Sequence, residues 1–215
     1  MDFYEVMRTA STTRYFRPDP VPDDVIYRVL DNARFAPSGG NRQGWRVVVV
    51  KDAETRKKLA GMYMEVWEPY EEQIRAAATT QQRQRAIDRT SEFARSVDQI
   101  PVHLLVCADL STLLVTDAEL SRQSIVGGAS VYTFVQNIIL ACRNEGLGIA
   151  LTTLLCRIED QVEELLGMPD GVGLAAFMPL GYPDPERLVT KTSRRPVEEF
   201  AFRESFGGQP LGVSS

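Results

Sequence analysis

The distribution of apolar residues predicts helices that alternate with short strands. After a short helix expected at 3–9, apolar side chains recur at helical spacing between 22 and 36, and Pro37 ends the run. The four valines at 47–50 are β-branched and too few for a helix, so we expect a fully buried strand. Only the loop at 37–44 separates these two elements.

The chain continues this alternation to about residue 183. Further helices are expected at 53–66, 121–145 and 158–167, and further strands at 101–109, 148–155 and 172–183. The helix at 121–145 is the most apolar, with small residues at 127–130 in its first half and Gly146 as its C-terminal stop. Helices interleaved with about four strands predict an α/β or α+β sandwich.

Two segments depart from this pattern. The segment at 68–95 has many helix formers but a thin apolar stripe, which predicts a partly exposed excursion. From residue 183 onward the chain is polar and irregular, and it lacks a core of its own. We therefore expect 183–215 to wrap over another subunit. No repeat or low-complexity linker divides the chain, so we expect a single domain over 1–215.

Composition narrows the class of protein. The 24 basic and 29 acidic residues give a formal charge of −5, which disfavours a general nucleic-acid binder. The three cysteines are widely spaced and His103 is the only histidine, so no multi-histidine metal site is expected and His103 is expected to be structural. No apolar run approaches the ~20 residues that span a bilayer, and the N-terminus lacks a signal-peptide pattern, so a cytoplasmic protein is expected.

Arginines near both ends of the chain are candidate anion ligands. Arg8 and Arg14 flank the hydroxyls of residues 11–13, and Arg194 and Arg195 lie near the other end. Such groups can hold a phosphate through paired hydrogen bonds, although they can equally be solvated surface charges. The sequence has no GxxxxGK[ST] motif, and "GLGIAL" is not GxGxxG. If a phosphate binds, separated basic residues must hold it.

The loop before the valines has two interpretations. Gly39 and Gly40 permit positive φ and a close approach of backbone to a flat ligand. The amides of Asn41 and Gln43 could pair with the edge of a heteroaromatic ring. Alternatively, the loop is a turn whose amides satisfy its own backbone.

Four segments together resemble the FMN-dependent nitroreductase superfamily, including its iodotyrosine deiodinase branch. They are "RTASTTRYF" with "PVPDDVIYRVLDNARFAPSGGNRQGW", then "RVVVV", "ASVYTFVQNIILACRNEGLGIALTT" and "PLGYPDPERLVTKTSRRP". The resemblance covers nearly the whole chain. It implies an α+β fold with a mixed sheet flanked by helices, in an intertwined homodimer with two FMN molecules at the interface.

The resemblance also implies roles for individual residues. Arg14 would approach the pyrimidine edge of the flavin, and Thr12 its ribityl or phosphate group. Arg194 would bind the phosphate, with Arg8 and Arg195 as helpers. From the partner subunit, the loop would supply Pro37, Ser38, Gly39, Asn41 and Gln43. Leu151, Thr152 and Thr153 would face the reactive N5, with the two threonines as hydrogen-bonding candidates.

Two positions depart from the family pattern. The family usually has two adjacent basic residues and then Ser shortly before the equivalent of Arg14, whereas this chain has Ala10, Ser11 and Thr12. Arg8 could replace the pair only by reaching from further back. The usual Gln-Pro-Trp is Gln43-Gly44-Trp45 here, and we expect it to loosen the loop.

The implied activity is an oxidoreductase with flavin-centred chemistry, which needs no protein nucleophile. NADH or NADPH would be the transient donor, and nitroaromatics or quinones the acceptors, in a ping-pong reaction. The segment at 62–100 would act as a lid, where Met62, Tyr63, Trp67 and Tyr70 either contact the substrate or anchor the segment to the core. Alternatives are a reductive dehalogenase similar to iodotyrosine deiodinase and a flavin-binding or storage protein without turnover.

Overall fold

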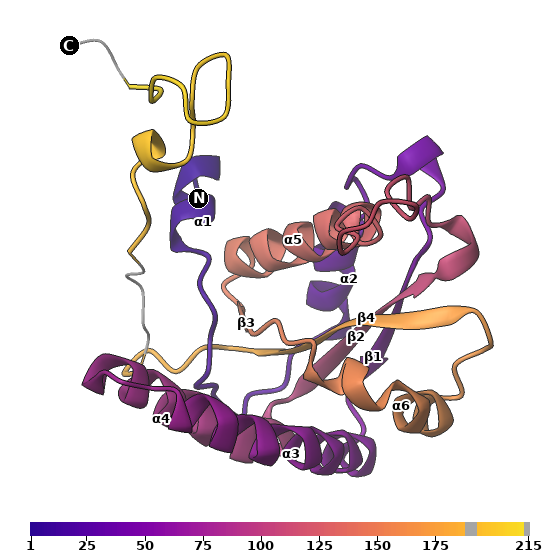
Figure 1. Ribbon diagram of the computed structural model, residues 1–215. Helices are drawn as coiled ribbons and strands as arrows, with labels where there is room; N and C mark the ends of the chain where they lie inside the picture. The colour runs from indigo at the N-terminus through magenta and orange to yellow at the C-terminus, as the bar shows by residue number, and fades with distance from the viewer. Residues whose placement is uncertain (188–192, 213–215) are drawn as a thin grey trace.

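A four-stranded sheet in the order β1-β2-β4-β3 forms the centre of the computed structural model (Figure 1). The structure describes residues 1–187 and 193–212. The strands are β1 (Trp45–Val50), β2 (Val102–Asp109), β3 (Gly148–Ile149) and β4 (Val172–Gly181). Each pair of neighbouring strands is antiparallel, and Thr12 adds a parallel bridge to Ile149. The predicted α+β class is confirmed.

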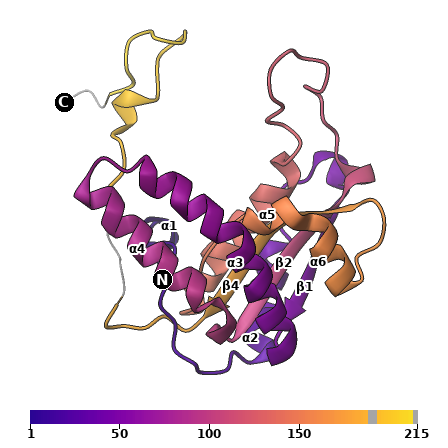
Figure 2. The ribbon, with the colours of Figure 1, turned by 60° about the horizontal axis from the view of Figure 1, so that its bottom comes forward.

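Helices cover both faces of the sheet (Figures 1 and 2). They are α1 (Phe3–Thr9), α2 (Asp23–Ala33), α3 (Ala53–Ala76), α4 (Gln81–Arg95), α5 (Ala129–Asn144) and α6 (Glu159–Leu166). Helices α2 and α5 lie on one face, whereas α3, α4 and α6 lie on the other. Within the described residues, no helix has the length and hydropathy to cross a membrane.

Strand β2 divides the core into two layers. Leu104 and Val106 face α2 and α5, whereas Leu105 and Cys107 face α3 and α6, as the two-residue period of a strand requires. All four side chains are at most 1% exposed because helices cover both faces. Each such buried apolar side chain contributes about 1.5–3 kcal/mol relative to an exposed one. The continuous apolar run that predicted this strand therefore reflects its central place in the sheet.

The valine strand is present but is not fully buried as expected. Of its six residues only Val50 is buried, and Val49 is 39% exposed. The reason is that β1 pairs with β2 alone and lies at the edge of the sheet. Neighbouring valines favour a strand, but they do not determine its position in the sheet.

Helix α5 begins at Ala129, eight residues later than expected. The buried carboxylate of Asp117 accepts hydrogen bonds from the Ser124 hydroxyl and the Ile125 amide, at 2.7 and 3.0 Å. Arg122 adds an ion pair at 2.7 Å. These bonds hold the segment before α5 in a non-helical loop, which projects from the molecule in Figure 2. They also lower the pKa of Asp117 to about 2, and the hydrogen bond from the Ile125 amide is the largest cause. The helix ends as predicted, with Gly146 at φ 76°.

Two further element boundaries differ from the expectation. Helix α3 continues through Pro69 to Ala76, and α4 follows after a short turn, so the predicted excursion is a pair of long helices. The strand expected at 148–155 is reduced to β3, after which Thr152 forms an isolated bridge to Phe177. The chain then enters a 3-10 helix at Leu154–Ile158.

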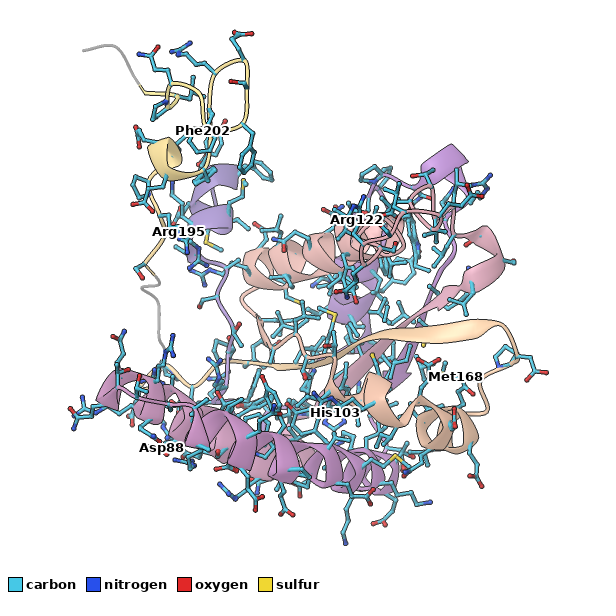
Figure 3. The ribbon with its side chains drawn as sticks, viewed as in Figure 1. Asp88, His103, Arg122, Met168, Arg195 and Phe202 are labelled. Carbon is cyan, nitrogen blue, oxygen red and sulfur yellow. The ribbon has the colours of Figure 1, made fainter. Side chains whose placement is uncertain are left out.

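The C-terminal segment, which carries Arg195 and Phe202, extends away from the sheet (Figure 3). Between 193 and 212 every residue except Ala201 and Gly208 is exposed. Phe200 is 62% exposed and Phe206 is fully exposed. Residues 188–192 and 213–215 of the predicted wrapping extension lie outside the described residues.

The one histidine of the chain, His103 of β2, is buried on the face of the sheet that α3, α4 and α6 cover (Figure 3). His103 Nε2 lies 2.8 Å from the Val97 carbonyl and therefore donates a proton to it. The ring packs edge-on against Phe177, with centroids 5.1 Å apart, and Nδ1 has no partner among the described residues. Burial lowers the pKa of His103 to about 4, so the ring is neutral, in agreement with its expected structural role.

This burial predicts a specific dependence of stability on pH. Between about pH 6.5 and 4 the unfolded chain binds a proton at His103 that the folded chain does not, so acidification lowers the free energy of unfolding. The slope attributable to His103 approaches about 1.4 kcal/mol per pH unit. Urea unfolding at several pH values measures it.

His103→Gln keeps a donor for the Val97 carbonyl but cannot titrate in this range. The variant should lose the His103 contribution to the slope. An unchanged slope in the variant would assign the effect to other groups.

Candidate functional site

The main cavity of interest lies between the N-terminal segment, the α3–α4 pair and the chain that follows β3. Its volume is about 410 Å³, within the range of small-molecule sites. We call it the Arg14 hollow; its lining is Thr12, Arg14, Tyr63, Trp67, Tyr70, Thr90, Phe93, Ala150, Leu151, Thr152, Thr153 and Leu154. Eight of these residues are predicted site residues, and they come from segments far apart in the sequence.

A backbone contact places Thr12 and Arg14 in the hollow. The Thr13 amide donates to the Ile149 carbonyl at 2.9 Å, beside the parallel bridge from Thr12. Thr13 packs directly on Gly148, where a Cβ atom would collide with the threonine side chain. The glycine thus allows the N-terminal segment to lie against β3, and the neighbouring residues 12 and 14 line the hollow.

The two threonines after β3 differ in how firmly they are held. Thr152 exchanges two backbone hydrogen bonds with Phe177, at 2.8 and 3.0 Å. Its hydroxyl oxygen accepts from the Leu154 amide at 3.3 Å and from the Tyr63 hydroxyl at 3.4 Å. Thr153 is exposed beside it, as is Leu151 at 41%. Thr152 is therefore fixed, whereas Thr153 presents its side chain to solvent.

Aromatic side chains of α3 form one wall. Tyr63 and Trp67 are each 2% exposed and have nearly parallel rings 6.5 Å apart. The Trp67 indole donates to Glu71 at 2.9 Å, and Tyr70 meets Trp67 edge-on. These buried contacts anchor α3 to the core, so they support the anchoring interpretation of the predicted lid residues. Met62, the fourth predicted substrate residue, packs on the same core and does not line the hollow.

The electrostatics of the hollow are dominated by Arg14. Its guanidinium is half-buried and makes no hydrogen bond or ion pair with the described residues. Burial lowers the pKa of Arg14, and the nearby positive charge of Arg89 lowers it further. Within the described part of the chain, no carboxylate lines the hollow. The site therefore favours an anionic ligand.

The other predicted arginines are not gathered here. Arg8 is exposed and stacks on Tyr4, with its guanidinium carbon 5.8 Å from the ring centre. Arg194 and Arg195 are exposed on the C-terminal segment, and Arg194 donates only to the neighbouring Ser193 carbonyl among the described residues. One chain thus brings only Arg14 of the predicted arginines to the hollow. Arg8 is on an exposed face of α1, which packs on α5, and Arg194 and Arg195 are on the exposed C-terminal segment.

Part of the predicted glycine loop lines a second, separate cavity of about 430 Å³. We call it the loop hollow; it is lined by Pro37, Ser38 and Gly39 together with Arg42, residues 112–114, Val126, Gly127, Ala129 and Ser130. The Gly39 amide donates to the Ser130 hydroxyl at 3.0 Å. The two hollows share no lining residue. The two predicted halves of the site therefore do not meet within one chain.

The amides of the loop bond to each other. The Gln43 side chain donates to Asn41 Oδ1 at 3.1 Å, and neither residue lines the loop hollow. Gly40, Asn41 and Gln43 all have positive φ, whereas Gly39 does not. This conformation is unfavourable for non-glycine residues and occurs preferentially at functional sites.

Gly44 does not loosen the loop as expected. A Cβ atom at this position would collide with the Thr112 hydroxyl, and the Gly44 carbonyl accepts from the Asp109 amide at 2.8 Å. The missing side chain thus permits close packing between the loop and the chain after β2.

Sequence reasoning missed three residues of α4 that border the site. Thr90 and Phe93 line the Arg14 hollow, and Arg89 lies close enough to Arg14 to affect its pKa. The periodicity of α4 gave the signal for Phe93, which is a buried apolar residue. No local pattern distinguished Arg89 from the other arginines of the same helix.

Comparisons with known proteins identify relatives over most of the chain. Human iodotyrosine deiodinase 1 is 26% identical over 199 residues, which are 92% of this chain and 67% of that protein. A putative NADH dehydrogenase/NAD(P)H nitroreductase of Methanothermobacter thermautotrophicus is 27% identical over 201 residues, covering 87% of this chain and 86% of the relative.

Solved structures show the same fold. An oxidized iodotyrosine deiodinase bound to FMN and 3-iodo-L-tyrosine superimposes with a TM-score of 0.73 at 22% identity, covering 95% of this chain and all of the other. A BluB-like flavoprotein of Clostridium difficile 630 gives the same score, identity and coverage. The profile of the nitroreductase family matches residues 7–182, and the chain therefore belongs to this family.

Proposed function

We propose that this protein is an FMN-dependent oxidoreductase that transfers electrons from NADH or NADPH to small aromatic acceptors such as nitroaromatics or quinones. The observation that carries the proposal is the Arg14 hollow, where an unpaired guanidinium faces threonine hydroxyls and an aromatic wall. A flavin has the matching features of a flat ring with a polar edge and an anionic phosphate.

The residues of the hollow fit FMN. Arg14 would lie at the pyrimidine edge, where a positive charge favours the electron-rich reduced ring, and Thr12 would contact the ribityl chain. Leu151, Thr152 and Thr153 would border N5, with the fixed Thr152 on the protein side. Bound FMN would supply the redox chemistry in two half-reactions, while the protein holds it and controls what reaches it.

We propose a homodimer that completes the site. Pro37, Ser38 and Gly39 of a partner would close on the flavin, since these residues lie in a separate hollow of their own chain. The exposed phenylalanines of the C-terminal segment, Phe200 and Phe206, provide an apolar surface that a second subunit would cover. In this assembly the segment would carry Arg194 and Arg195 to the phosphate.

A reductive dehalogenase is the second candidate, because several relatives are iodotyrosine deiodinases. The resemblance to that branch implies that Glu, Tyr and Lys of a lid would bind the halotyrosine zwitterion. This chain has no lysine from 62 to 190. Glu71 is already bonded to Trp67 and Arg75, at 2.9 and 2.7 Å. Nitroaromatics and quinones are therefore the better-supported class of acceptor.

We predict that the purified protein is yellow and releases one FMN per chain on denaturation. Arg14→Ala should weaken FMN retention at least about tenfold, since a charge-assisted contact contributes roughly 1.5–3 kcal/mol. Arg194→Ala should also weaken it. Equilibrium dialysis measures both effects. Colourless protein that does not take up added flavin would contradict the cofactor assignment.

We predict steady oxidation of NADH or NADPH with a nitroaromatic or quinone, and parallel double-reciprocal plots as the two substrates are varied. The plots are parallel because the donor leaves before the acceptor binds. Turnover of halotyrosines alone would favour the dehalogenase. FMN binding without turnover of any of these acceptors would identify a storage or sensing protein.

A further inference from the structure

A narrow niche opens beside the Arg14 hollow. It lies between residues 11–15, Arg89 of α4 and Arg187, and we call it the arginine niche. Its volume of about 20 Å³ is near that of a single water molecule, so it can admit a small polar group and not a ring. Thr12 and Arg14 line both the niche and the Arg14 hollow, which connects the two spaces.

One of the three arginines in the niche is already neutralised. Arg187 forms an ion pair with Glu92 at 2.7 Å and stacks on the Tyr15 ring, 3.5 Å from its centre. The second carboxylate oxygen of Glu92 accepts from the Tyr15 hydroxyl at 3.0 Å. Both oxygens of this carboxylate are therefore engaged. The next carboxylate on α4, Asp88, pairs with Arg75 at 2.9 Å.

Arg14 and Arg89 are left with positive charge that no described residue neutralises. Neither forms an ion pair or hydrogen bond within the described part of the chain, and the charge of Arg89 acts on Arg14. The two like charges repel each other, and an anionic group bound in the niche beside Arg89 would relieve this repulsion. A guanidinium group together with the hydroxyl of the exposed Thr12 is a suitable ligand set for a phosphate.

The sequence has a corresponding gap. The two basic residues expected before Arg14 are replaced by Ala10 and Ser11. Arg8, the nearest alternative in the chain, stacks on Tyr4 and does not line the niche. Arg89 reaches the same segment from α4, so a residue about 80 positions away in the sequence supplies charge where the local pair is absent.

We propose that Arg89 is a ligand of the FMN phosphate and replaces the missing basic pair. This inference rests on the proposed function. The ring would occupy the Arg14 hollow, and phosphate oxygens would enter the niche between Arg89 and Thr12. Helix α4 would then contribute to cofactor retention as well as to the wall of the site.

Comparison of FMN with riboflavin, which lacks the phosphate, tests the role of Arg89. Protein stripped of flavin is titrated with each ligand at constant ionic strength, and quenching of flavin fluorescence gives Kd. Arg89→Gln should raise Kd for FMN at least about tenfold and change Kd for riboflavin less than twofold. Arg85→Gln removes an exposed arginine one turn earlier on α4 and should leave both values within twofold. Circular dichroism and Tm verify that the variants are folded.

The outcomes separate this inference from the proposed function. Equal weakening of FMN and riboflavin, or no weakening of either, would overturn the role of Arg89 while the wild type still binds flavin. An unchanged Kd for FMN with a raised KM for carboxylated acceptors would assign Arg89 to the acceptor instead. Wild-type protein that binds neither flavin would reject the proposed function and the inference together.

Discussion

The contact between the N-terminal segment and β3 is the constraint on which the candidate site depends. The backbone amide of Thr13 donates a hydrogen bond to the Ile149 carbonyl. This approach is possible because Gly148 has no side chain that would collide with Thr13. The contact joins segments about 135 positions apart and brings Thr12 and Arg14 beside the threonines that follow β3. Without it, the hydroxyls, the guanidinium and the aromatic wall would belong to separate surfaces.

The same contact explains why the positive charge of Arg14 lies in a half-buried position in the hollow. A guanidinium drawn into a half-buried position loses hydration and would ordinarily be paired with a carboxylate. The two carboxylates of α4, Asp88 and Glu92, are engaged with Arg75, Arg187 and Tyr15. Among the described residues the fold thus leaves Arg14 without a partner, and this arrangement suits an anionic ligand. Under the proposed function, selectivity for an anion would follow from the arrangement of acidic groups as much as from that of the arginines.

The sequence predicted those features that are encoded in local periodicity. The apolar run of β2, the stop at Gly146 and the grouping of Arg14 with Thr152 follow from residue pattern or motif order. The position of β1 at the sheet edge could not be predicted, since strand order is a property of the whole chain. The late start of α5 depends on Asp117 binding residues seven and eight positions ahead, which competes with helix formation. Arg89 escaped prediction because only the packing of α4 brings it to the N-terminal segment.

The aromatic wall of the Arg14 hollow is also part of the protein core. Tyr63 and Trp67 contact the same layer as Phe93 and Phe177, so α3 cannot swing outward without exposing several large rings to water. Replacing a buried ring of this kind by alanine costs about 3–5 kcal/mol. A substitution that widens the cavity at these rings therefore also lowers the stability of the protein. An evolutionary or engineered change in the width of the cavity is more accessible at Thr153, whose side chain is exposed and does not belong to the core.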